Sequence, residues 1–279
     1  MAGYDDEYFE GVGICNDYMF REVFRRDPGL AGRLVACVLE RPVRPVSYLD
    51  DNHELKQTFG AHGSTLDVYV RMDDGSLANV EMQDYRERAL ALRMRAHLSA
   101  MDRDALPAGR DRSLSAWASS VFVCTKDHVG DGRRKHTAHW RLEEVDACVM
   151  TRQEMVILYA GGRRGEVSPQ LDAFLRYVAG YTGEDVLDDP FVRELDEAVR
   201  EVRRDNTWRE GFVTVQEKLE TWYNQGLEQG ASRERERIAR LLQARGMSAE
   251  EARDLVGVAD PRRREAGELP HEAGGRDAF

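Results

Sequence analysis

The chain has no long hydrophobic run. Among its 279 residues, no apolar stretch approaches the roughly 20 residues that a helix needs to cross a bilayer. The first residues, MAGYDDEYFEG, are acidic and lack the basic and then apolar pattern of a secretory signal. These absences exclude a membrane-spanning class, and we expect a cytoplasmic protein with no membrane partner.

Cysteine is scarce, and its spacing contains no CxxC pair. We expect free thiols in a reducing compartment, because the four cysteines are far apart in the chain: Cys15, Cys37, Cys124 and Cys148. Cys124 with His128, His136 and His139 has too irregular a spacing to favour a zinc site.

Several chemical signatures are also missing. The chain has no P-loop, no GxGxxG and no local motif of a Ser/His/Asp or Cys/His enzyme. With 40 basic against 51 acidic residues, its net charge of −11 argues against a protein that coats nucleic acid through bulk charge. A nuclease is still compatible, because it needs only a local basic rim around an acidic centre.

The hydrophobic content of 42% is enough for a core, and its periodicity predicts an α/β fold. We expect a mixed sheet flanked by helices in residues 1–180, a helical extension in 181–258 and a disordered tail in 259–279. The predicted helices cover 16–40 (split at Pro28), 87–104, 171–181, 191–206, 208–246 (long and broken) and 247–258. The predicted strands lie near 46–50 and 56–59, in a hairpin at 66–83, and at 115–125 and 154–160, with a polar loop at 126–136.

The hairpin is LDVYVRMDDGSLANVEMQ, from Leu66 to Gln83. A two-residue turn would set the apolar face of one arm against the polar face of the other. A three-residue turn ending at Gly75, in the left-handed conformation, gives consistent burial. It pairs Val68 with Val80 and places Asp67 opposite Glu81.

Two carboxylates opposite each other destabilise a sheet unless a cation lies between them. Asp67 and Glu81 therefore suggest a site for Mg²⁺ or Mn²⁺. Gln83 lies on the same face, and the backbone carbonyl of Met82 offers a further oxygen ligand. The alternative is an ordinary solvated face, since antiparallel sheets commonly have one wet side.

The hairpin motif, D followed by ExQ, resembles the central motif of the PD-(D/E)XK nuclease superfamily. It is most similar to the branch of PD-(D/E)XK nuclease family transposases, related to the Rpn recombination-promoting nucleases. The similarity extends over about residues 16–246 and includes five further segments: NDYMFREVF, RMRAHLSAMD, VFVCT, FVRELDEAVREVRRDNTWRE and GLEQG.

The resemblance implies a restriction-endonuclease-like fold and a Mg²⁺-dependent DNA endonuclease linked to recombination or a mobile element. Asp67 and Glu81 then take the places of the metal-binding acids, and Gln83 stands where the superfamily usually has lysine. Because Gln83 is neutral, positive charge must come from elsewhere. The accessory candidates are Arg93 and Arg95 on the following helix, and Asp17 and Glu22 on the first helix.

The C-terminal region suggests a partner. Residues 239–258 have a helix-turn-helix pattern, but their second helix is acidic, which favours self-association over reading of DNA bases. The interleaved charges of the preceding helix suit a homodimer. The alternative function is a nuclease-fold protein without turnover that binds nucleic acid or a protein partner through this helical region.

Overall fold

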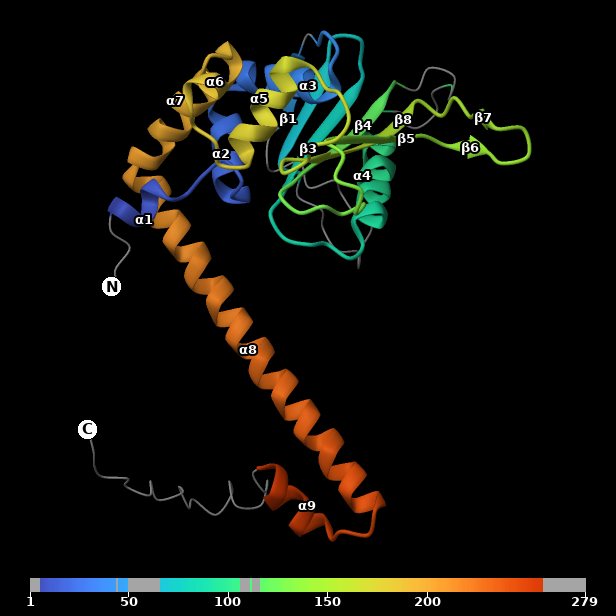
Figure 1. Cartoon of the computed structure of the whole chain (residues 1–279), viewed down its shortest axis with the longest axis vertical. Coiled ribbons are helices and arrows are strands. Elements are labelled where there is room, and N and C mark those ends of the chain that lie inside the picture. The colour runs from blue at the N-terminus through green and yellow to red at the C-terminus, as the bar shows by residue number, and fades with distance from the viewer. Residues whose placement is uncertain (1–5, 44, 50–65, 106–110, 112–115, 258–279) are drawn as a thin grey trace. The chain divides into compact units, whose positions relative to one another are not determined.

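A mixed six-stranded sheet forms the centre of the fold (Figure 1). The structure is a computed structural model that describes residues 6–43, 45–49, 66–105, 111 and 116–257. The strand order is β1-β2-β3-β4-β8-β5, in which β3, β4 and β8 are parallel and the other neighbours are antiparallel. The strands are β1 Pro45–Leu49, β2 Val68–Met72, β3 Leu77–Gln83, β4 Ala118–Cys124, β5 Lys135–Ala138 and β8 Gln153–Tyr159.

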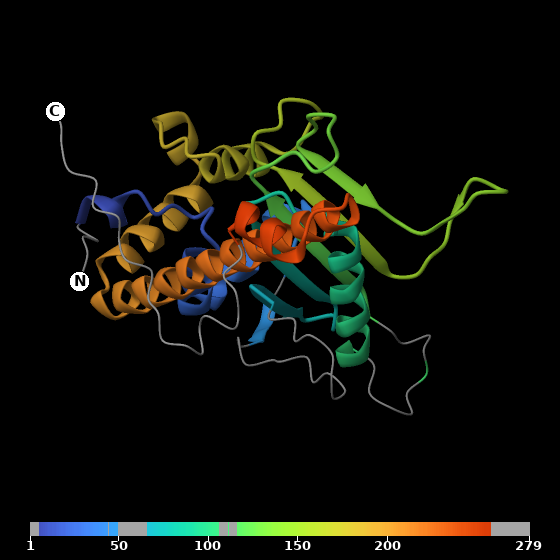
Figure 2. The same ribbon diagram turned by 90° about the horizontal axis from the view of Figure 1, so that it is seen from below.

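Helices cover both faces of this sheet (Figures 1 and 2). Helices α2 and α3 pack on one face of the hairpin strands, and α4 packs on the other face, against β3, β4 and β8. The helices are α1 Asp6–Glu10, α2 Asp17–Arg26, α3 Pro28–Leu39, α4 Leu90–Ala105, α5 Pro169–Val178, α6 Glu184–Leu187, α7 Pro190–Arg204, α8 Asn206–Ala244 and α9 Ala249–Val256. The expected α/β class with a mixed sheet, flanking helices and a helical C-terminal region is confirmed.

Short capping signals fix the helical pair that covers the hairpin. Asn16 caps α2, because its side chain accepts a hydrogen bond from the Met19 N–H. Asp27 ends α2 and caps α3 through the Leu30 N–H, and Pro28 occupies the first turn of α3, where its missing N–H costs nothing. The predicted split at Pro28 is therefore confirmed.

The hairpin has the register that a three-residue turn requires. Val68 pairs with Val80 and Val70 with Ala78. The Met72 N–H donates to the Ser76 carbonyl at 2.8 Å, and Gly75 has φ +82°. This register places Asp67 and Glu81 on the same face of adjacent strands.

The turn depends on Gly75, because side chains with a Cβ are strained at its positive φ. We expect Gly75→Val to lower the free energy of unfolding by about 1–3 kcal/mol, as measured by urea denaturation. Asp73→Val, at an exposed neighbouring position without a positive φ, is the control and should change stability by less. Equal losses in both variants would contradict the role given to Gly75.

The edge beyond β8 differs from the sequence prediction. The prediction of a polar loop at 126–136 was wrong at its end, because β5 begins at Lys135 and pairs antiparallel with β8. Its half-exposed and exposed residues gave no buried alternation to detect. A small hairpin of β6 (Arg141–Leu142) and β7 (Ala147–Cys148) extends beyond the sheet between β5 and β8 (Figure 2).

The chain divides into two compact units, residues 1–210 and 211–279. The boundary expected after residue 180 lies inside the first unit, since α7 packs against α2, α3 and α5. Helix α8 is continuous rather than broken, and α9 begins with a capping box of Ser248 and Glu251. The strand expected at 56–59 and the tail at 259–279 lie outside the described residues. No helix in the described part of the chain is long and apolar enough to span a bilayer.

Candidate active site

The polar face of the hairpin is buried. Asp67 is 8% exposed, Glu81 0% and Gln83 1%. Around them, Leu90, Met94, Leu98 and Met101 of α4 pack in apolar clusters with residues of the neighbouring strands. A solvated hairpin face is therefore excluded, and these polar groups need partners within the protein.

Each acid of the pair is bonded to the backbone beside the other. The Asp67 N–H donates to Glu81 Oε1 at 3.2 Å, and the Met82 N–H donates to Asp67 Oδ2 at 3.1 Å. These two bonds bring the carboxyl groups together at one end of the hairpin. The side-chain placement follows directly from the register of the turn.

Arg21 of α2 lies beside Asp67, with its Nε 3.5 Å from Asp67 Oδ1. Burial raises the pKa of Asp67 well above its usual value, and the negative charge of Glu81 raises it further. The charge of Arg21 and the Met82 hydrogen bond act in the opposite direction without cancelling these effects. Ionised Asp67 is thus disfavoured in the folded chain unless more positive charge is supplied.

The raised pKa of Asp67 makes stability depend on pH in a defined direction. Below the unfolded-state pKa, Asp67 is protonated in both states. As pH rises through the interval up to the folded-state pKa, the folded chain binds more protons, so stability falls. We expect Asp67→Asn to be more stable than wild type at about pH 8 in EDTA and nearly equal to it at about pH 4, because only wild type has a carboxylate to ionise.

Urea unfolding at the two pH values measures this difference, and Asp73→Asn, at an exposed turn position, is the control. The asparagine side-chain oxygen can still accept from the Met82 N–H, so the hydrogen bond is matched. A variant that gains no stability relative to wild type on going from acid to alkaline pH would contradict the prediction.

Arg93 of α4 connects Glu81 and Gln83. Its two terminal nitrogens donate to Gln83 Oε1 at 2.9 Å and to Glu81 Oε2 at 3.0 Å. The guanidinium also lies over the Phe122 ring, 5.3 Å from its centroid, and the side chain is 35% exposed. Gln83 donates in turn to the Tyr85 carbonyl at 3.1 Å. Gln83 therefore helps to position the Arg93 guanidinium, whose positive charge the neutral Gln83 side chain lacks.

Asn79 and His97 support Glu81 from the buried side. The Asn79 amide lies 2.9 Å from Glu81 Oε1, to which it donates, and 3.1 Å from His97 Nδ1. Burial lowers the pKa of His97 and the charge of Arg93 lowers it further, although Glu81 opposes them. A neutral ring accepts the Asn79 hydrogen bond at Nδ1, and it stacks on Phe122 with centroids 5.6 Å apart.

The remaining candidates from the sequence lie on α2 and α4, outside the Asp67–Glu81 pair. Asp17 is exposed and lies 3.8 Å from Arg21, so it reaches the site through that arginine. Arg95 is exposed. Burial raises the pKa of Glu22, but hydrogen bonds from Arg25 and Arg26 outweigh this and hold it below its usual value. Glu22 thus belongs to an ionic cluster that Arg26 joins to Asp205.

Arg21, His97 and Asn79 did not emerge from the sequence as site residues. A signal for the first two is present, because Arg21 follows Asp17 by four residues and His97 follows Arg93 by four. Residues four apart share one side of a helix. A helix known to cover the hairpin would therefore direct Arg93 and His97 to the same place.

The donors at the site suit a hard divalent cation. Two carboxylates with water as the remaining ligands match the coordination that Mg²⁺ prefers. Burial and the charge of Glu81 raise the pKa of Asp67 even with Arg21 beside it, so a further cation would favour the ionised pair. Within the described ranges, no group of three or more His, Cys, Asp or Glu side chains is placed to hold a metal. The protein ligands of the ion would be the Asp67 and Glu81 carboxylates, with the Met82 carbonyl as the further oxygen ligand expected from the sequence.

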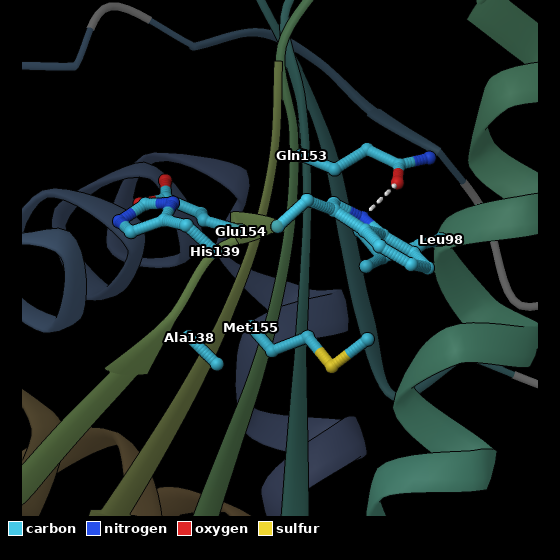
Figure 3. A pocket seen from close by; sticks show the side chains of 7 residues that line it. Leu98, Ala138, His139, Gln153, Glu154 and Met155 are labelled. Atoms are coloured by element: carbon cyan, nitrogen blue, oxygen red, sulfur yellow. Dashed lines mark hydrogen bonds between the residues drawn. The ribbon is translucent and has the colours of Figure 1, made fainter. Parts of the chain in front are cut away.

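A separate cavity of about 200 Å³ lies farther along the sheet, beside α4 (Figure 3). It is lined by Leu98, Ala138, His139, Trp140, Gln153, Glu154 and Met155, none of which is a predicted site residue. The Trp140 Nε1–H donates to Gln153 Oε1 at 3.2 Å. The Glu154 carboxylate accepts a hydrogen bond from the Ser119 hydroxyl and forms an ion pair with Arg41, so its contacts are structural ones.

Comparison of the chain with protein-family models, with curated proteins and with solved structures returns no match. The functional interpretation therefore depends on the chemistry of the Asp67, Glu81, Gln83 and Arg93 cluster itself.

Proposed function

We propose that the chain is a Mg²⁺-dependent DNA endonuclease of the PD-(D/E)XK type with a restriction-endonuclease-like core, linked to recombination or a mobile element. The observation that carries the proposal is the pair of Asp67 and Glu81, whose burial, together with their mutual repulsion, raises the pKa of Asp67. Such a pair is costly for a structural hairpin and useful for binding a cation. The resemblance of the hairpin to the nuclease motif supports the same interpretation.

The arrangement of the sheet is further support. The acidic pair lies on an antiparallel hairpin, and the next strand, β4, runs parallel to its second arm. Helices cover both faces of these strands. This is the mixed α/β architecture that the nuclease resemblance implies.

The side chains have separable tasks in the proposed reaction. Asp67 and Glu81 would hold Mg²⁺, which when bound lowers the pKa of a coordinated water so that it can attack a phosphodiester. Arg93 provides positive charge beside this pair, where negative charge develops on phosphate oxygens. Gln83 and Phe122 fix the guanidinium, and Asn79 and His97 fix the Glu81 carboxylate.

Cleavage of supercoiled plasmid DNA by the full chain tests the proposal. Nicked or linear product should form with Mg²⁺ and not with EDTA. Asp67→Ala, purified in parallel, should yield no product above background, while Asp73→Ala, which removes an exposed turn carboxylate, should cleave like wild type. Cleavage that is absent, or equal in wild type and Asp67→Ala, would overturn the proposal.

The second candidate is a nuclease-fold protein that binds nucleic acid or a protein partner without turnover. The observation in its favour is that both acids already have an arginine neighbour, Arg21 at Asp67 and Arg93 at Glu81. Binding of DNA with no product in Mg²⁺ or Mn²⁺ would favour this function.

A further inference from the structure

Helix α8 carries an exposed apolar stripe. Five large side chains recur at helical spacing and are between 48% and 66% exposed: Leu219, Trp222, Tyr223, Leu227 and Leu241. The helix has 39 residues and is therefore about 58 Å long. Large exposed apolar and aromatic side chains gathered on one stripe are typical of a surface that binds a protein.

Two glycines of this continuous helix lie on the side that carries the stripe. Gly226 and Gly230 lie one turn apart, and a Cβ at either position would meet no heavy atom within 4 Å. Each glycine costs a helix interior about 1 kcal/mol relative to alanine. The described residues of this unit do not fill the space, whereas a second helix crossing there would approach more closely because of it.

The charges of α8 are divided along its length. Residues 217–228 contain Glu217, Glu220 and Glu228 against Lys218 alone. Residues 233–240 contain four arginines against Glu234 and Glu236. A second copy running in the opposite direction would place the acidic half on the basic half at both ends. A parallel copy would place like charges together.

The apolar positions are symmetric about the same point. Leu219 and Leu241 lie at equal separations from Gly230 in the sequence, and so do Trp222 and Ile238. A cavity of about 360 Å³ in the basic half is lined by Arg233, Glu236, Arg237, Arg240 and Leu241. An aromatic side chain from an antiparallel copy would meet arginines here, a favourable cation–π arrangement.

From the stripe, the glycines and the charge division, we infer that residues 219–241 of α8 bind the same segment of a second copy of this chain, antiparallel and with its two-fold axis near Gly230. The inference is independent of the proposed nuclease activity, because none of these residues belongs to the Asp67–Glu81 site.

Sedimentation of the full chain tests the surface. Wild type should be a dimer at micromolar concentration, and Trp222→Glu should raise the dissociation constant by about 100-fold. Thr221→Glu adds the same charge on the side of the helix opposite Leu219 and Tyr223 and should leave the dimer intact. A monomeric wild type, or a dimer that both variants weaken equally, would overturn the inference.

Disulfide cross-linking tests the orientation. In a Cys148→Ser background, which removes the exposed native thiol, Leu219→Cys and Leu241→Cys proteins are oxidised alone and as a mixture. The antiparallel arrangement predicts a cross-linked dimer only in the mixture. Cross-links within each single variant, and not in excess in the mixture, would show a parallel pair and overturn the inference.

Discussion

Glu81→Gln is expected to lower the rate of Mg²⁺-dependent plasmid cleavage by about 1000-fold. The substitution keeps the shape of the side chain and removes one charge. The new amide keeps one oxygen that can accept from Asn79 or from Arg93, while its NH2 group faces the other donor, so the melting temperature of the variant is measured to establish that it is folded. What is lost is half of the negative charge that would hold the metal.

The same variant should also lose the stabilisation that Mg²⁺ gives to wild type. A ligand that binds only the folded state stabilises it by RT ln(1 + [L]/Kd), so wild type should melt higher in Mg²⁺ than in EDTA. Glu81→Gln should show little of this shift, whereas Glu143→Gln, which neutralises an exposed carboxylate on the β6–β7 hairpin, should keep both shift and cleavage. A folded Glu81→Gln protein that cleaves within a few-fold of wild type would contradict the assignment of Glu81.

The register of the hairpin was predictable because two local rules agree on it. The alternation of apolar residues demands that Val68 and Val80 share a face, and Gly75 permits the three-residue turn that achieves this. The pairing of Asp67 with Glu81 then follows from counting. No knowledge of distant residues is needed for this part of the site.

The burial of the polar face was not predictable in the same way. It depends on where α4 lies, and Arg93 and His97 look like surface residues of an amphipathic helix when read alone. Only the packing of Met94 and Leu98 on the sheet turns their side of the helix toward Glu81. The edge strand β5 was not predicted for a related reason. Among the described strands it pairs with β8 alone, its residues are half-exposed or exposed, and its sequence has no apolar alternation.

Arg93→Met is expected to lower the cleavage rate by about 100-fold, in the range found when one donor to a developing negative charge is removed. Its effect should differ in kind from that of Glu81→Gln. Methionine removes a cation that competes for Glu81, so the Mg²⁺-dependent rise in Tm should persist or increase while the maximal rate falls. Arg93→Lys should recover part of the rate, because a single ammonium replaces the charge but cannot contact Gln83 and Glu81 with the same two-pronged geometry.

Arg95→Met is the matched control, since Arg95 is an exposed arginine on the same helix, two residues from Arg93. If Arg93 only anchors α4, the Met variant should melt lower than wild type, and any loss of cleavage should disappear when assays are run well below its Tm. If Arg93 supplies charge to the reaction, the loss remains at every temperature at which the variant is folded, and the lysine variant lies between the two. Equal rates for Arg93→Met and Arg95→Met would remove Arg93 from the proposed site. They would also leave Gln83 with no cation to position.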